Sequence, residues 1–315
     1  MKPALSLIFF TVGSGAGLGL LAWLVMSRLF NQQAHNGASL IWGATLGLGL
    51  LGMGLIASSL HLANRVNAWR AFSGWRSSWL AREAIAALVI WPVAALWLYG
   101  AFAGWRRLEV VAGVLVLVVL LCTLWSTAMI YACLRTIPRW HSWHTRAGFP
   151  LYACVSGGLL WWAVIAATDP ARLVPLDRWR GVLTVLLACA AFLKYAHWKA
   201  FAGRRPGAIS SAAALGLQGK ASLLDAGHTG PTFLTREFGY RLDPNRATLL
   251  RWIALLLAFA VPALLIGWPA VGAGVLAWLA ALAACLALVG LGLERWLFFA
   301  EAEHVVRLYH GADSV

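Results

Sequence analysis

Long apolar segments are the feature that most constrains this chain. Eight runs near the length of about 20 residues that a helix needs to cross a bilayer cover residues 5–30, 40–61, 83–104, 109–134, 149–168, 181–198, 247–267 and 270–299. Backbone in lipid must satisfy its own hydrogen bonds, so such runs form helices. The sequence therefore predicts an all-α fold, a polytopic membrane helix bundle with eight transmembrane helices, built as a single membrane domain over residues 1–315.

Composition agrees with this fold and excludes other classes. The chain is 61% hydrophobic and only 11% charged, whereas a soluble domain is roughly 25% charged. The net charge of +14 would suit a protein that binds nucleic acid, but the arginines lie between apolar runs rather than in one basic patch. We therefore expect membrane lipid, and no nucleic acid, as a partner. The first apolar run is too long for a signal peptide and is kept as a span.

The longest polar stretch, at about 199–249, is predicted to be a cytoplasmic loop between the sixth and seventh spans. A loop of this length is usually functional or a docking segment. Glycines recur in the first two spans, as in the pairs Gly13/Gly17 and Gly15/Gly19. Small residues four apart let a neighbouring helix approach closely, so these two spans are predicted to pack tightly.

The distribution of basic residues predicts the orientation in the membrane. Eight spans place both termini on one side, and nineteen of the 25 Lys and Arg residues then lie on that side against six on the other. Basic residues concentrate in cytoplasmic loops. We therefore expect a multi-pass protein of a bacterial inner (cytoplasmic) membrane with both termini cytoplasmic.

One stretch brings titratable groups to the ends of two spans. His61 ends the second span and Glu83 opens the third, with arginines and tryptophans between them. Ionisable groups at membrane depth are costly, so they are functional candidates. Two interpretations stay open: a pair that exchanges protons with a bound ligand, or a wet interfacial histidine among headgroup anchors. Further candidates for the same cytoplasmic site are Arg76, Trp79, Arg82, Glu294 and Arg295.

Two other functional classes receive less support from the residues. A haem b anchor requires two facing intramembrane histidines, and only His61 and His197 lie near span ends. A transporter usually has charged groups at the membrane midplane and inverted repeats, and neither is evident. The pair His141 and His144 has metal-ligand spacing but no cysteine or carboxylate close by in sequence, so no metal site is predicted.

Several stretches, in order, resemble the membrane anchor subunit of dimethyl sulfoxide reductase-type molybdoenzymes. They are SLIFFTVGSGAGLGLL (6–21), SSLHLANRVNAWRAF (58–72), WLAREAIAA (79–87), RTIPRWHSWHTRAGF (135–149) and GLERWLFF (292–299). The resemblance implies an eight-span subunit without metal or haem that holds an iron–sulfur, ferredoxin-like subunit. That subunit exchanges electrons with a catalytic subunit in which molybdopterin is bound, and the anchor exchanges them with quinone, either ubiquinone or menaquinone.

The resemblance also implies roles for particular residues. In the family, a histidine that ends the second span and a glutamate that opens the third are tied to quinol, and His61 and Glu83 match them. Arg76 or Arg82 is then placed to hold Glu83 charged; binding of lipid phosphate by these arginines is the open alternative.

Two features differ from the reductase anchor and favour a related anchor subunit. The long loop contains GHTGPTFLTREFGYR (227–241), and the basic residues place the docking face inside the cell. Both features are similar to the anchor of the cytoplasmic sulfite dehydrogenase, which passes electrons from sulfite oxidation to quinone. The resemblance therefore implies a sulfite:quinone oxidoreductase subunit, with a dimethyl sulfoxide reductase anchor that oxidises menaquinol as the alternative.

Overall fold

A computed structural model describes residues 3–31, 35–59, 65–173, 177–202, 212, 216–218, 224, 242–268 and 272–310. Regular structure within these ranges is helical throughout. The six helices that form the first six spans are α1 (Leu5–Phe30), α2 (Gly37–Ser59), α3 (Trp79–Phe102), α4 (Arg106–Ala132), α5 (Trp143–Thr168) and α6 (Asp177–Ala202). The seventh span comprises α9 (Pro244–Leu255), the π-helical turn η3 (Leu256–Ala260) and α10 (Val261–Gly267), and the eighth is α11 (Ala273–Ala300).

The described residues thus contain eight helical segments long and apolar enough to cross a membrane, which confirms the predicted fold class. Three short helices lie outside these segments or at their edges: η1 (Arg65–Gly74), η2 (Pro170–Leu173) and η4 (Val305–His310). Local sequence sets several helix starts. Ser78, Ser142 and Asp243 precede α3, α5 and α9, and their side-chain oxygens accept hydrogen bonds from backbone N–H groups three residues later.

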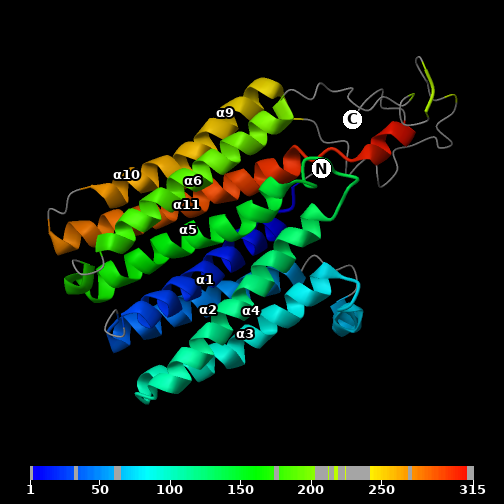
Figure 1. The fold of residues 1–315 in the computed structure, drawn as a ribbon. Helices are drawn as coiled ribbons and strands as arrows, with labels where there is room; N and C mark the ends of the chain where they lie inside the picture. The colour runs from blue at the N-terminus through cyan, green and yellow to red at the C-terminus, as the bar shows by residue number, and fades with distance from the viewer. Residues whose placement is uncertain are drawn as a thin grey trace.

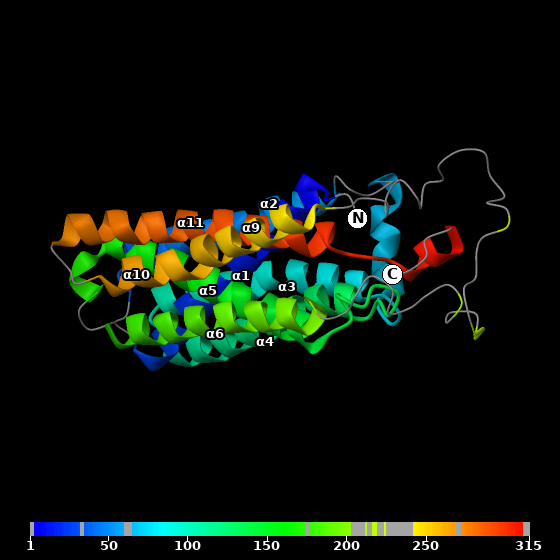
Figure 2. The ribbon, with the colours of Figure 1, turned by 90° about the horizontal axis from the view of Figure 1, so that it is seen from above.

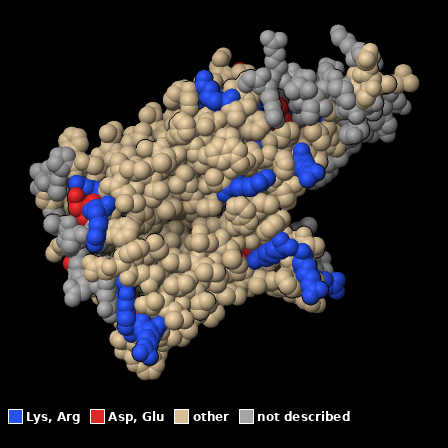
Figure 3. All heavy atoms as spheres, in the orientation of Figure 1, with Lys and Arg blue, Asp and Glu red and all other residues tan. Residues whose placement is uncertain are grey.

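The helices run alongside one another, and the start of α1 and the end of α11 lie at the same end of the bundle (Figure 1). We call this the terminal end and the opposite one the far end. Helix α1 lies near the centre, packed on α2, α4, α5 and α11, and it is the most buried of the spans (Figure 2). Helices α3 and α4 pack mainly on each other. Charged side chains gather toward the two ends, with an uncharged band between them (Figure 3).

The predicted glycine contacts of the first two spans are confirmed. A Cβ added at Gly17 of α1 would meet the carbonyl oxygen of Gly47 in α2, so the two backbones touch. On the other face of α1, Gly19 lies against the backbone of Ala153 and of Gly157 in α5. Side chains larger than hydrogen do not fit at these crossings, which explains why the central helix is rich in glycine.

The connection between the sixth and seventh spans is shorter than its predicted bounds of 199–249, because the flanking helices extend into that range. Helix α6 continues to Ala202, and α9 begins at Pro244. Lys194, which was counted with the basic residues of the terminal side, lies inside α6 with 1% of its surface exposed. Most of residues 203–241, including the segment 227–241, lies outside the described residues.

Candidate functional site

Glu83 is buried inside the bundle near the terminal end. It lies in the second turn of α3, with 3% of its surface exposed, and accepts a hydrogen bond from the Thr127 hydroxyl of α4. Within the described part of the chain, no Lys, Arg or His side chain forms an ion pair with Glu83. A carboxylate buried without a cation is costly, so the position of Glu83 is unusual for a purely structural residue.

The hydrogen bonds around Glu83 suit both protonation states. The Thr127 hydroxyl has one hydrogen and two acceptors within reach, Glu83 and the Thr123 carbonyl oxygen at 3.0 Å. When Glu83 is ionised, it accepts that hydrogen. When Glu83 is protonated, its own O–H can donate to Thr127, which then donates to the Thr123 carbonyl. This arrangement lets the carboxyl group gain and lose a proton without leaving a partner unsatisfied.

The arginines near Glu83 in sequence point elsewhere. Arg82 donates to the carbonyl oxygens of Trp75 at 2.8 Å and of Arg76 at 2.6 Å, and its guanidinium lies 4.3 Å from the ring centroid of Trp79. Arg76 is exposed and lies over the Trp75 ring. Neither arginine holds Glu83 charged in this structure, contrary to that expectation. Arg76 and Arg82 instead contact the backbone and the tryptophan rings of the segment that leads into α3.

His61, the second half of the predicted pair, lies outside the described residues. Helix α2 ends at Ser59, two residues before it, and η1 begins at Arg65. The end of α2 and the start of α3 both lie at the terminal end of the bundle (Figure 1).

A second buried charged group joins α6 and α11. Glu294 of α11 is fully buried; it pairs with Lys194 of α6, and its other oxygen accepts from Nε of Arg295 at 2.5 Å. Two cations share one carboxylate, so the group is formally positive by one charge. Burial of three charges is tolerated because each has an opposite partner.

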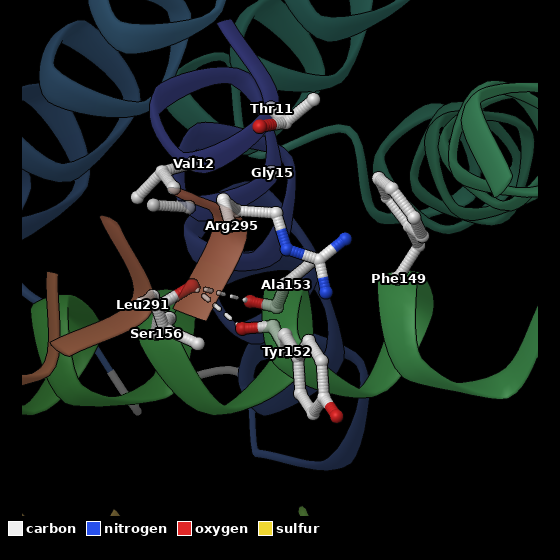
Figure 4. A pocket seen from close by; sticks show the side chains of 10 residues that line it. Thr11, Val12, Gly15, Phe149, Tyr152, Ala153, Ser156, Leu291 and Arg295 are labelled. Atoms are coloured by element: carbon white, nitrogen blue, oxygen red, sulfur yellow. Dashed lines mark hydrogen bonds between the residues drawn. The ribbon is translucent and has the colours of Figure 1, made fainter. Parts of the chain in front are cut away.

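The Arg295 guanidinium reaches from this group into a small cavity between α1, α5 and α11 (Figure 4). Its Cζ lies 4.3 Å from the Phe149 ring centroid and 5.3 Å from that of Tyr152, and its buried Nη1 has no hydrogen-bond partner among the described residues. Thr11 and Ser156 contribute hydroxyl groups to the lining. The volume of about 20 Å³ is sufficient for one water molecule, the simplest partner for Nη1.

Aromatic rings connect the two charged regions. Tyr131 of α4 lies one helical turn after Thr127, the hydrogen-bond partner of Glu83, and its ring contacts Phe149 and Phe298, over which Arg295 lies. Its ring stacks on Phe149 at 5.3 Å between centroids and contacts Trp140, Phe298 and Phe299 edge-on. The predicted residues Glu83, Glu294 and Arg295 therefore border one aromatic cluster at the terminal end.

An outer layer of charges closes the terminal end of the bundle. Glu301 accepts from Arg139 of the α4–α5 loop at 3.0 Å and from Arg251 of α9 at 2.7 Å. His197 of α6 donates to the Arg139 carbonyl oxygen at 3.1 Å and stacks on His144 at 5.2 Å. These contacts tie the α4–α5 loop, α6, α9 and α11 together.

Sequence reasoning missed the partners of several candidates. Lys194 falls inside the predicted sixth span, and a basic residue within an apolar helix is a signal for burial with a counter-charge. Thr127 carried no signal, because a lone threonine in an apolar run is common. Among the described residues, no group of three or more His, Cys, Asp or Glu side chains is arranged to hold a metal ion.

Comparison with known proteins identifies relatives along the whole chain. Residues 1–300 match the family model described as DMSO reductase anchor subunit (DmsC). A sulfite dehydrogenase subunit of Allochromatium vinosum is 33% identical, with 98% of this chain and 99% of the relative covered. Anaerobic dimethyl sulfoxide reductase chain YnfH of Escherichia coli K12 is 27% identical over 46% of this chain and 51% of its own length.

Proposed function

We propose a function from the premise that this chain belongs to the DMSO reductase anchor subunit family. The chain would be the quinone-reactive membrane subunit of a three-subunit molybdenum and iron–sulfur oxidoreductase. Electrons would pass between the iron–sulfur subunit, docked at the terminal end, and the quinone pool. Membership of the family establishes an anchor subunit of a redox complex; the quinone reaction, its residues and the orientation are our proposal.

The observation that carries this proposal is the burial of Glu83 and its hydrogen bond with Thr127. Reduction of a quinone takes up two electrons and two protons, so a site needs groups that deliver protons to two carbonyl oxygens. Glu83 is buried, has no cationic partner among the described residues, and has hydrogen bonds suited to both protonation states. We assign it the delivery of one proton, and His61, with an unperturbed pKa of about 6.5, the delivery of the other.

Other residues of the chain support that role indirectly. Thr127 orients the Glu83 carboxyl group, and Trp79 with Arg82 stiffens the segment that leads into α3. The positive group of Lys194, Glu294 and Arg295 lies across the Tyr131 cluster and would favour negative charge developing on a bound quinone. The Arg76 side chain is exposed, so it would have to turn toward the bundle in order to contact a bound quinone.

Sulfite is the proposed substrate of the complex. The relative that covers the whole chain is a sulfite dehydrogenase subunit, whereas the reductase chain matches about half. Oxidation of sulfite with one water yields sulfate, two protons and two electrons, which balances the reduction of one quinone to quinol. A reductase that draws electrons from menaquinol is the second candidate, favoured by the match to YnfH.

The test separates quinone chemistry from the rest of the complex. Complexes carrying Glu83→Gln or His61→Ala are purified with all subunits in equal amounts and assayed with sulfite, using either a quinone or an artificial dye that accepts electrons from the soluble subunits. Loss of an acid–base group typically lowers the rate about 10²–10⁴-fold. We expect that loss with quinone and an unchanged rate with dye.

Glu303→Gln provides the matched control, because it removes a carboxylate at the same end of the bundle but outside the proposed site. It should retain wild-type rates with both acceptors. Wild-type quinone activity in both the Glu83 and His61 variants would refute the site. Dimethyl sulfoxide reduction by quinol in the wild-type complex, without sulfite oxidation, would instead establish the second candidate.

A further inference from the structure

A groove between α6 and α9 is unrelated to the region around Glu83. Its walls are Tyr195, Trp198, Lys199 and Ala202 on α6 and Thr248, Arg251, Trp252 and Leu255 on α9. Each set has the spacing i, i+3, i+4, i+7, so each is one continuous face of its helix. The groove has a volume of about 220 Å³, whereas the cavity at Arg295 has about 20 Å³. It therefore has room for part of a chain-like molecule.

The groove exists because α6 and α9 are held apart at this level. Helix α6 packs its backbone against α10 and η3, deeper in the bundle. There Pro262 removes the backbone N–H that Ala258 would otherwise bond, and the helix widens into the π-helical turn. Toward the terminal end, aromatic side chains bridge the gap, with Tyr195 and Trp252 at 6.4 Å between ring centroids.

Polarity changes with depth along this groove. Helix α6 ends and α9 begins at the terminal end, so Lys199 and Arg251 lie closer to the membrane surface, and Tyr195 and Leu255 lie deeper. The two cations therefore lie nearer the surface than the aromatic and aliphatic side chains of the groove, with only Ala202 and Thr248 outside them. That order matches a phospholipid, whose phosphate lies at the headgroup level and whose acyl chains lie below it.

The cations at the mouth are positioned for an anion. Arg251 is fixed by Glu301 through its Nε atom and lies over the Trp198 ring at 5.8 Å. A guanidinium retains further N–H donors after such a contact. Glu301 is shared with Arg139, so the two arginines and the carboxylate keep a formal positive charge, to which Lys199 adds a second. Cationic pockets between spanning helices bind anionic lipid headgroups.

We propose that the α6–α9 groove is a specific binding site for one anionic phospholipid. Its phosphate lies between Lys199 and Arg251, and one acyl chain lies along Trp252 and Leu255. The bound lipid would fill the space between the sixth and seventh spans and connect them where their backbones are apart.

Native mass spectrometry of the full-length chain, delipidated and titrated with phosphatidylglycerol, tests the site. One basic contact with an anionic lipid corresponds to about a fivefold change in affinity. We expect one tightly retained phosphatidylglycerol in the wild type, about fivefold weaker retention in Lys199→Gln, and no change in Arg107→Gln. Arg107 is the matched control, since it is exposed at the far end of the bundle.

Two more variants separate charge from shape and guard against misfolding. Ala202→Trp fills the groove mouth without changing charge and should abolish retention, while Arg251→Lys keeps the charge and the pairing with Glu301 and should stay within about twofold of wild type. Equal retention of phosphatidylcholine and phosphatidylglycerol, or undiminished retention in Lys199→Gln and Ala202→Trp, would overturn the proposal. The proposal would also be overturned if a quinone displaced the lipid and bound equally well to the wild type and to Lys199→Gln, since the groove would then be a quinone site.

Discussion

Loss of Glu294 and loss of one of its two cations have different consequences for the buried charged group. Removing Lys194 leaves Glu294 paired with Arg295, whereas neutralising Glu294 leaves two buried cations facing each other. Loss of one member of a buried ion pair costs about 3–5 kcal/mol when the remaining charge is uncompensated. The three residues are therefore not equivalent, although all lie in one contact group.

We predict that Glu294→Gln lowers the free energy of unfolding by about 3 kcal/mol or more, and that Lys194→Met lowers it by less. Both are measured by denaturant titration of the full chain in mixed micelles. Glu303→Gln, a carboxylate change outside any buried group, should have little effect. An equal loss in the two variants would mean that Arg295 does not stabilise Glu294 on its own.

At the scale of elements, the crossing of α1 and α5 depends on the absence of side chains. Gly19 touches the α5 backbone, whereas Gly49 of α2 has open space where a Cβ would be. Replacement of glycine by alanine favours a helix by about 0.5–1 kcal/mol when nothing else changes. Overpacking at a tight contact costs about 1–3 kcal/mol.

These magnitudes predict opposite signs for one chemical change. Gly19→Ala should destabilise the chain by about 1–2 kcal/mol, while Gly49→Ala should be neutral or slightly stabilising. The same micelle titration measures both. If Gly19→Ala is tolerated as well as Gly49→Ala, then α1 and α5 can separate without cost and the close crossing is not a determinant of the fold.

Spans and close crossings were readable from the sequence, because apolar length and glycine spacing are local patterns. The predicted runs became helices, and Gly17 and Gly19 lie at contacts. Pairings between residues far apart in the sequence could not be predicted from it. Arg28 of α1 bonds Glu109 of α4 at 2.5 Å, and Lys194 meets Glu294 one hundred residues later in sequence. Hydropathy places charges at a depth, but it does not select the neighbouring helix.

The candidate site was predictable only in part for the same reason. Glu83, Glu294 and Arg295 were identified by their positions at span ends, and all three are buried. The Glu83–Thr127 contact depends on how α3 packs on α4, and the direction of Arg82 depends on the carbonyl groups of the preceding turn. Both are consequences of tertiary structure.

For the whole molecule, the arrangement of the ends gives a topology prediction. The start of α1 and the end of α11 lie at the terminal end, and the sequence assigns nineteen of the 25 Lys and Arg residues to that side, so we expect that end to be cytoplasmic. Green fluorescent protein fused after Val315 should fluoresce, and alkaline phosphatase fused there should be inactive. Phosphatase activity with a dark fluorescent fusion would reverse the orientation and place the docking face of the complex outside the cytoplasm.

The central place of α1 has a consequence for biosynthesis. Helix α1 leaves the ribosome before the helices that enclose it, which include α5 and, much later in the chain, α11. Synthesis proceeds from the N-terminus, so the glycine contacts of α1 with α2 and α5 can form early, while the side of α1 that faces α11 stays uncovered until the eighth span has been inserted. A chain truncated before α11 therefore leaves one side of its central helix exposed to lipid, although α2, α4 and α5 are already in place.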